Sequence, residues 1–315
     1  MKKKIKINFT DFWHPNTQEA IRNNPLFMLL SKRFDLELSD NPDFIIYSCF
    51  DVNFLRYKCV RIFYTGENIR PNFNECDYAF SFDYPITDKN YRLPLYKLYK
   101  EFEELKKKKD INEIKKVKKD FCSFVYTKKK AKERIKFFHK LQKYKNIDSG
   151  GKLLNNIGYR IDNKVEFLRK YKFTIAFENS SYPGYTTEKL MQAFVANTVP
   201  IYWGNPLVSR DFNPESFINC QDYKNFDEVV ERVIEVDNND ELYIKYLMES
   251  PFQNNNENEY VKEENILRRF EEIFSNKNIT LAAKKSNLSK PYTHPIYIKN
   301  KCRKIYHLFR AMFSD

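Results

Sequence analysis

A short segment near the middle of the chain carries the residue types of an anion-binding site. The motif GYTTEK, residues 184–189, leads into an apolar helical pattern and then into the strand-like VPIYWG, residues 199–204. Thr186 or Thr187 can cap a helix, and Gly184 permits the tight backbone that precedes one. The amino end of a helix carries about half a positive charge and free N–H groups, which suit a phosphate.

Lys189 is the residue of this motif that a simple helix start does not explain. A cation in the first turn opposes the helix dipole, so it makes sense if an anion binds at the same place. Glu188 beside it could hold a ligand hydroxyl. The alternative is a capped helix whose Glu–Lys pair faces water, and this alternative leaves Tyr185 and Lys189 unexplained.

Other devices for binding phosphates or metals are absent from the sequence. It contains no GxxxxGK[ST], no GxGxxG and no Asp-x-Asp pair, so lysine, arginine and the helix end would have to neutralise the anion. This arrangement fits a diphosphate leaving group that needs no metal. The sequence also has no CxxC and no HExxH, and we therefore predict no metal site. Mn²⁺ or Mg²⁺ could still stimulate activity without dedicated ligands.

The chain is basic, and this limits its partners. A net charge of +13 favours nucleic acid, a phosphorylated small molecule or an anionic membrane surface. Residues 98–119 are rich in lysine, which favours a solvated helix or loop over a dedicated binding patch. No RRM, KH or zinc-finger pattern is present, so we predict no nucleic-acid partner and keep a basic nucleic-acid-binding protein as the alternative.

Cysteine usage and the start of the chain favour the cytoplasm. The six cysteines form no CxxC pair, and they are best interpreted as buried, reduced thiols. The opening MKKKIKINFTDFW has no apolar run, so we expect neither a signal peptide nor an N-terminal membrane anchor. The apolar stretches of the chain are too short to span a bilayer.

The order of the predicted elements indicates an α/β protein. Strand patterns at 5–10, 41–50, 59–65 and 75–84 alternate with helical pieces, which is typical of a parallel sheet. After 147–152 the pattern restarts as a second Rossmann-like unit. The predicted domains are two Rossmann-like units at residues 1–147 and 148–277 and a basic amphipathic helical tail at residues 278–315; the resemblance described below implies that the first is the acceptor-side domain and the second binds the nucleotide sugar.

The predicted tail has an apolar face opposite lysines and arginines. One interpretation is a helix docked on its own protein, and the other is peripheral attachment to an anionic membrane.

Four blocks of the sequence resemble the α1,3/4-fucosyltransferases, particularly the bacterial members. FENSSYPGYTTEKLMQAFVANTVPIYWGNP matches the signature of that family in order and spacing, and RIFYTGENIRPNFNECDYAFSFDY resembles its N-terminal block. DSGGKLLNNIGYRIDNKVEFLRKYKF and the FCSFV strand with its Arg-bearing helix also agree. The resemblance covers residues 5–235.

The resemblance implies a GT-B architecture, in which two Rossmann-like domains face a cleft. It implies an inverting transfer of L-fucose from GDP-fucose, which binds mainly to the C-terminal domain. The expected acceptor is GlcNAc or Glc in a β-galactoside glycan such as N-acetyllactosamine, with an α1,3 or α1,4 linkage. In a bacterial enzyme at the inner membrane face, this would be a lipopolysaccharide O-antigen of the Lewis type.

The resemblance also assigns roles to individual residues. Glu67 matches the general base, although the residues alone favour a carboxylate that caps a turn. Arg134 and Lys189 match the positive groups around the diphosphate, and Arg134 alone would be interpreted as a surface charge. Glu188 matches a contact to the fucose hydroxyls, and Tyr185 a donor-site residue.

Weaker donor-side candidates are Asn179, Ser149, Gly150 and Thr186. The chain departs from the family where Thr127-Lys128 replaces the usual Ser-Asn. A transferase for another GDP-sugar is a further alternative.

Overall fold

The computed structural model describes residues 2–117, 120–276, 281–282, 296 and 299–300, and it divides the chain into two compact units. The first unit combines Met1–Leu93 with the chain from Tyr260 onward, and the second is Pro94–Glu259. The helical tail predicted at 278–315 lies outside the described residues except for those five positions.

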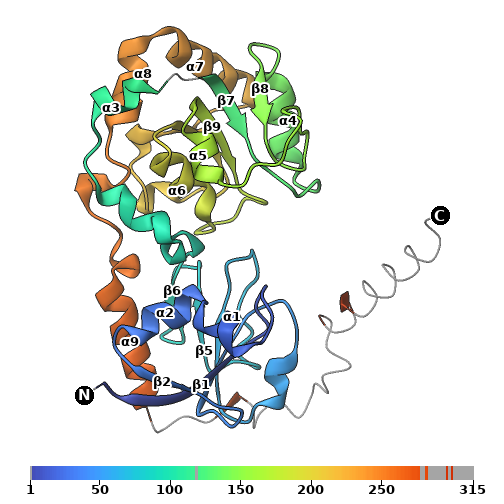
Figure 1. Ribbon diagram of the computed structural model, residues 1–315, viewed down its shortest axis with the longest axis vertical. Helices are drawn as coiled ribbons and strands as arrows, with labels where there is room; N and C mark the ends of the chain where they lie inside the picture. Colours follow the sequence, from blue (N-terminus) through green and yellow to red (C-terminus); the bar gives the residue numbers. More distant parts are fainter. Residues whose placement is uncertain (1, 118–119, 277–280, 283–295, 297–298, 301–315) are drawn as a thin grey trace, which may run out of the picture. The chain divides into compact units, whose positions relative to one another are not determined.

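The first unit is built on a six-stranded parallel sheet (Figure 1). Its strand order is β2-β1-β3-β4-β5-β6. The strands are β1 (Lys4–Thr10), β2 (Asp35–Leu38), β3 (Phe44–Tyr47), β4 (Val60–Tyr64), β5 (Tyr78–Ser81) and β6 (Asn90–Arg92). The helices are α1 (Gln18–Arg22), α2 (Pro25–Ser31), the 3₁₀ helix η1 (Asn53–Arg56) and α9 (Glu263–Ser275).

Local sequence explains these elements. β1 alternates exposed lysines with buried apolar residues over its first half, while β3 is buried along its whole length, as a central parallel strand should be. Asn24 caps α2 by accepting a hydrogen bond from the amide of Leu26.

The helix α9, orange in Figure 1, joins this unit although it lies about 170 residues beyond β6 in the chain. Phe270 stacks on Phe80 with ring centroids 4.0 Å apart, and Phe274 packs edge-on against Phe44 at 4.7 Å. These aromatic contacts explain why α9 belongs to the first unit.

The second unit contains a five-stranded parallel sheet of order β11-β10-β9-β7-β8. The strands are β7 (Asp120–Phe124), β8 (Ile147–Ser149), β9 (Tyr171–Phe177), β10 (Val199–Trp203) and β11 (Ile218–Asn219). The α-helices are α3 (Ile111–Lys116), α4 (Lys132–Leu141), α5 (Lys164–Leu168), α6 (Glu188–Val195), α7 (Phe226–Asn238) and α8 (Asp240–Met248). Short 3₁₀ helices are η2 (Leu95–Leu98), η3 (Lys100–Lys106), η4 (Val208–Arg210), η5 (Pro214–Ser216), η6 (Cys220–Asp222), η7 (Gln253–Asn255) and, at the boundary of the two units, η8 (Glu259–Val261).

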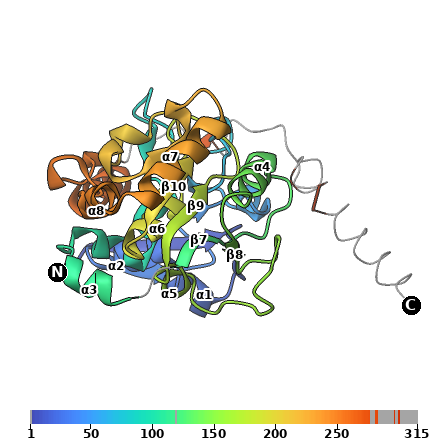
Figure 2. The ribbon, with the colours of Figure 1, turned by 90° about the horizontal axis from the view of Figure 1, so that it is seen from above.

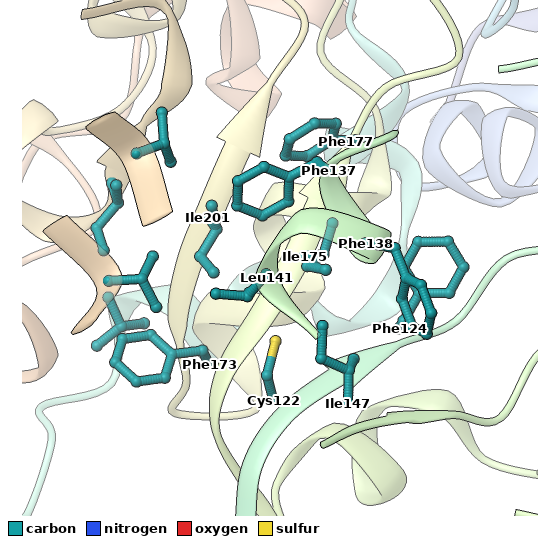
Figure 3. Close-up of a cluster of buried hydrophobic side chains, with 14 of the residues drawn as sticks. Cys122, Phe124, Phe137, Phe138, Leu141, Ile147, Phe173, Ile175, Phe177 and Ile201 are labelled. Atoms are coloured by element: carbon teal, nitrogen blue, oxygen red, sulfur yellow. The ribbon is translucent and has the colours of Figure 1, made fainter. Parts of the chain in front are cut away.

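Helices cover both faces of this second sheet (Figure 2). One face packs against α4 and α7, and Figure 3 shows the resulting core, with Phe137 stacked on Phe177 at 5.0 Å. The other face packs against α6. The α/β class and the parallel sheets predicted from the sequence are thus confirmed.

The division between the units differs from the boundary predicted at residue 147. β7 pairs with both β8 and β9, so the chain from Asp120 onward already belongs to the second sheet. The second unit therefore begins at Pro94, and the helix predicted at 260–277 returns to the first unit as α9.

The turn after β8 approaches the chain at the end of β7 very closely at Gly151. A Cβ atom at Gly151 would lie 2.1 Å from the carbonyl oxygen and 2.4 Å from the amide nitrogen of Tyr126, and backbone cannot move aside easily. We expect Gly151→Ala to lower the free energy of unfolding by about 3 kcal/mol in urea denaturation. Gly158→Ala is the control, because its Cβ would meet no atom within 4 Å and the cost of about 1 kcal/mol comes only from its left-handed backbone. Equal losses in the two variants would contradict the close approach.

Candidate active site

The candidate site lies where the strand order of the second sheet reverses. From β7 the chain continues outward to β8, and then crosses over to β9 on the other side of β7. In open α/β sheets, ligands bind at the carboxyl ends of the two strands that flank such a reversal. Here these ends lead into residues 125–127 and 178–180.

Arg134 of α4 is buried at this reversal and is not the surface charge that its lysine-rich surroundings suggest. Its Nη2 donates to the carbonyl of Phe177 at 2.9 Å and to Oδ1 of Asn179 at 2.9 Å. The guanidinium lies 3.9 Å from the ring centroid of Tyr126. Its Nε has no hydrogen-bond partner among the described residues. The structure thus brings together Arg134 and Asn179, two residues that the sequence analysis named as donor-site candidates.

Tyr126 fixes the end of β9 as well as supporting the guanidinium. Its hydroxyl donates to the carbonyl of Ile175 at 2.8 Å and accepts from the amide of Phe177 at 2.7 Å. Burial raises the pKa of Tyr126 to about 12, so the phenol stays neutral at ordinary pH. No sequence signal singled out this tyrosine.

The start of α6 departs from the predicted capping. Thr187 occupies the N-cap position, yet it makes no side-chain capping hydrogen bond. Its amide and hydroxyl both donate to the carboxylate of Glu178, each at 2.7 Å. Thr186 is also buried, and its hydroxyl accepts from the side-chain amide of Asn205 at 3.0 Å.

The tight turn before α6 is the one that the sequence predicted. Gly184 has a φ of +84°, in the region that favours glycine. Its amide donates to Oδ1 of Asn205 at 2.6 Å. Tyr185 follows it and is 1% exposed.

Lys189 forms a buried ion pair with Glu178, which the sequence reasoning missed. Its Nζ lies 3.1 Å from Oε2 of Glu178 and donates to the hydroxyl of Thr187 at 2.7 Å. Glu178 has no exposed side-chain surface. The sequence does carry a signal for Glu178, because in the FEN motif an acidic residue directly follows a buried apolar strand. Part of the reason for a lysine in the first turn is therefore this carboxylate.

Charge interactions keep both Lys189 and Glu188 ionised. Burial alone would lower the pKa of Lys189, but Glu178 and Glu188 more than offset it and raise the pKa. Burial alone would raise the pKa of Glu188, but Lys189, 3.4 Å away, and Lys164 bring it to about 2.

Lys164 is a second residue that the sequence reasoning missed. It begins α5, which packs against α6, and it interacts electrostatically with Glu188, Lys189, Glu178 and Arg134. Burial lowers its pKa. Arg134, Lys164 and Lys189 thus gather with Glu178 and Glu188, and a cluster with this many basic groups suits an anion.

Ser149 and Gly150, two weaker candidates, use their hydrogen-bonding groups within their own turn. The hydroxyl of Ser149 donates to the carbonyl of Leu153 at 2.7 Å, and its amide donates to Oδ1 of Asn156 at 2.7 Å. The amide of Gly150 donates to the carbonyl of Phe124 at 3.1 Å. The hydrogen bonds that the structure describes for Ser149 and Gly150 therefore stabilise the turn after β8.

Glu67 belongs to the first unit and follows the carboxyl end of β4. It is half-buried, and its carbonyl accepts from the hydroxyl of Thr65 at 3.0 Å, while its amide donates to the same hydroxyl at 3.1 Å. The backbone of Glu67 is therefore fixed in a turn that directly follows a strand end, at the edge where ligands of α/β sheets bind.

The described residues contain neither a metal-ligand cluster nor a membrane-spanning helix. Within residues 2–117, 120–276 and the few described beyond them, no group of three or more His, Cys, Asp or Glu side chains could hold a metal ion. In the same part of the chain, no helix combines the length and apolar character needed to cross a membrane.

Comparisons with known proteins give this geometry a family context. Residues 7–99 match the family model described as alpha-(1,3)-fucosyltransferase FucT N-terminal domain. Residues 114–271 match the model described as glycosyltransferase family 10 (fucosyltransferase) C-term.

Individual relatives that match this chain also carry fucosyltransferase names. The alpha-(1,3)-fucosyltransferase FucT of Helicobacter pylori is 32% identical over 287 residues, which cover 78% of this chain and 60% of that protein. The human 4-galactosyl-N-acetylglucosaminide 3-alpha-L-fucosyltransferase 9 is 34% identical over 116 residues, or 36% of this chain and 32% of that protein. The chain thus spans less than two thirds of the length of these relatives.

A solved structure confirms the fold. The crystal structure of an alpha1,3-fucosyltransferase with GDP-fucose matches with a TM-score of 0.77 and 30% identity, over 89% of this chain and 93% of that chain. The two-domain α/β fold is therefore the one predicted, consistent with the GT-B architecture.

Removal of the Glu178 carboxylate should destabilise the protein. Glu178→Gln leaves the buried ammonium of Lys189 without its closest carboxylate, and breaking such a pair costs about 3 kcal/mol. Urea denaturation measures this loss. The control is Glu166→Gln on α5, whose side chain is 63% exposed and should change stability little. Equal, small changes in both variants would contradict a structural role for the Glu178 pair.

The low pKa of Glu188 predicts a specific dependence of stability on pH. Its pKa is about 2 in the folded protein against a usual 4.5, so its stabilising effect is full above pH 4.5 and is lost as pH falls toward 2. We expect the stability difference between the wild type and Glu188→Gln to shrink over that range. Urea denaturation from pH 6 to pH 3 measures it, and a difference independent of pH would contradict the assignment.

Proposed function

Because the chain belongs to glycosyltransferase family 10, the fucosyltransferases, we propose that it transfers L-fucose from GDP-fucose to a glycan hydroxyl, forming an α1,3 linkage. The observation that carries the proposal is the cluster of cations at the reversal point of the second sheet, where the family signature begins α6. A nucleotide diphosphate is an anion that such a cluster suits.

The cationic side chains would act on the leaving group. As the bond from fucose to the diphosphate breaks, its electron pair leaves with GDP, and negative charge grows on the phosphate oxygens. Lys189 stays protonated in its buried setting, and Arg134 carries a fixed charge. Positive groups held in place before the reaction stabilise growing charge without reorganisation. Lys164 adds a third cation from α5.

The carboxylates would act on the sugar and the acceptor. Glu188 is ionised at neutral pH, so it can accept hydrogen bonds from fucose hydroxyls and stabilise positive charge at the anomeric carbon. Asn179 and Tyr185 are further donor-site candidates. Glu67 would take the proton of the acceptor hydroxyl as its oxygen attacks the anomeric carbon opposite GDP. This attack converts a β-linked donor into an α-linked product, which is inversion.

The proposed acceptor is GlcNAc in a β-galactoside glycan such as N-acetyllactosamine. The printed name of the human relative, a 4-galactosyl-N-acetylglucosaminide fucosyltransferase, supports this choice. Glucose as the acceptor sugar and an α1,4 linkage are variants of the same reaction. We place the enzyme in the cytoplasm, acting on a lipopolysaccharide precursor at the inner membrane face, where the basic net charge of +13 favours contact with anionic lipid. We propose that no metal is required, and that Mn²⁺ or Mg²⁺ can stimulate.

Release of GDP tests the proposal directly. Purified protein is incubated with GDP-fucose, with and without N-acetyllactosamine, and GDP and fucosylated product are measured. We expect release that depends on the acceptor. GDP-mannose in place of GDP-fucose should give little release, and equal release from both would favour a transferase for another GDP-sugar.

Substitution of the two central candidates tests their roles. Glu67→Gln removes the base and should lower kcat by about 10²–10⁴-fold. Lys189→Ala should lower kcat strongly too, because charge stabilisation in the transition state is lost. Glu19→Gln, an exposed glutamate of α1, is the control for the first variant. Folded Glu67→Gln or Lys189→Ala protein with unchanged transfer would contradict the assigned roles.

A further inference from the structure

Two aromatic rings of the first unit are exposed at adjacent strand ends. Trp13 is 53% exposed and Phe50 is 38% exposed, the most of any Phe, Tyr or Trp in the described part of this unit. Their ring centroids lie 6.3 Å apart with the planes at 79°. An exposed pair of this kind marks a binding surface more often than isolated apolar residues do.

The pair lies at the reversal point of the first sheet. Trp13 follows β1 and Phe50 follows β3, and the strand order β2-β1-β3-β4 reverses between these two strands. This is the place in an α/β sheet where a ligand is expected. The same rule locates the cation cluster in the second sheet.

The backbone beneath the rings is firmly held. Asp11 has a φ of +61° and is buried, and its carboxylate accepts from the amide of Asn53 at 3.1 Å and the amide of Phe54 at 2.8 Å. The carbonyl of Asp11 accepts from the amide of Phe50 at 3.1 Å. One residue therefore connects the loops that carry both rings, and it orients them before any ligand binds.

A short chain of contacts connects this pair to the candidate base. Cys49 directly precedes Phe50, and its Sγ lies 3.9 Å from the hydroxyl oxygen of Thr65. The same hydroxyl donates to the carbonyl of Glu67 at 3.0 Å. The rings and the candidate base thus lie on neighbouring strand ends of one sheet edge.

Because the two rings and the candidate base follow neighbouring strand ends of one sheet edge, we propose that Trp13 and Phe50 form a platform on which a pyranose ring of the acceptor glycan stacks. The inference rests on the proposed function. A pyranose offers an apolar face of C–H groups and a rim of hydroxyls, so an aromatic platform with polar neighbours matches it. Asp51 directly follows Phe50 in the chain and is a polar residue of this kind. An aromatic ring presents a large apolar area at a small entropic cost.

The first test separates acceptor binding from donor chemistry. Trp13→Ala should raise the KM for N-acetyllactosamine about tenfold, equivalent to about 1.4 kcal/mol. GDP release without acceptor and the KM for GDP-fucose should stay unchanged, and Trp13→Phe should recover part of the loss. Met28→Ala is the control, because Met28 is 51% exposed on α2 of the same unit.

Two outcomes would overturn the platform. One is a KM for N-acetyllactosamine in Trp13→Ala that equals that of Met28→Ala. The other is a fall in melting temperature with an unchanged KM, which would mean that the rings hold another part of the chain. The side-chain amide of Asn300 donates to the carbonyl of Phe50 at 2.8 Å, which makes Asn300 the candidate for that other contact.

A second readout does not depend on activity. The chain has two tryptophans, so Trp203→Phe leaves Trp13 as the only one. Titration with N-acetyllactosamine in the presence of GDP should quench or shift its fluorescence, and an unchanged spectrum would contradict stacking on Trp13. If wild-type protein fails to release GDP from GDP-fucose, the proposed function fails, whereas this titration still reports on the platform.

Discussion

The buried pair of Glu178 and Lys189 determines the geometry of the candidate active site. Glu178 directly follows β9, and Lys189 lies in the first turn of α6. Their ion pair therefore holds the start of the helix against the end of the strand. Thr187 completes it by donating twice to the carboxylate. Two apolar residues could pack here without the desolvation penalty of an ion pair. The ion pair instead holds the charged ammonium of Lys189 at the amino end of α6, where the helix dipole already favours an anion. Two apolar residues could not perform this role.

The two units share one topological device and use it for different chemistry. Each sheet reverses its strand order once, between β1 and β3 in the first and between β7 and β9 in the second. In the second, the residues at the reversal are cationic and buried, and in the first they are aromatic and exposed. The fold thus provides two equivalent places for ligands. Under the two proposals made above, the side chains that follow the strands make one place suit a diphosphate and the other a sugar ring.

Features that depend on adjacent residues could be predicted from the sequence, whereas features that depend on contacts between distant segments could not. The turn at Gly184 and the helix after it follow from a few adjacent residues, and so did the anomaly of Lys189. Glu178 escaped because its partner lies eleven residues away and meets it only once β9 and α6 are packed. Arg134 resembles its lysine neighbours until α4 is placed against the sheet. The boundary at 147 was misjudged because pairing of β7 with β9, and the return of α9, depend on contacts between distant segments.

The structural and the electrostatic roles of Lys189 depend on each other. In the resting protein its charge is balanced by Glu178 and Glu188, so the ammonium is stable although it is nearly buried. Arg134 and Lys164 interact electrostatically with the same carboxylates. Under the proposed function, a leaving diphosphate gains negative charge during bond cleavage, so these basic groups would stabilise it more than they stabilise an intact donor. Stabilisation that grows toward the transition state accelerates a reaction, whereas uniform binding does not. A site whose carboxylates hold its lysine in place can therefore remain charged without a ligand and still favour departure of the leaving group.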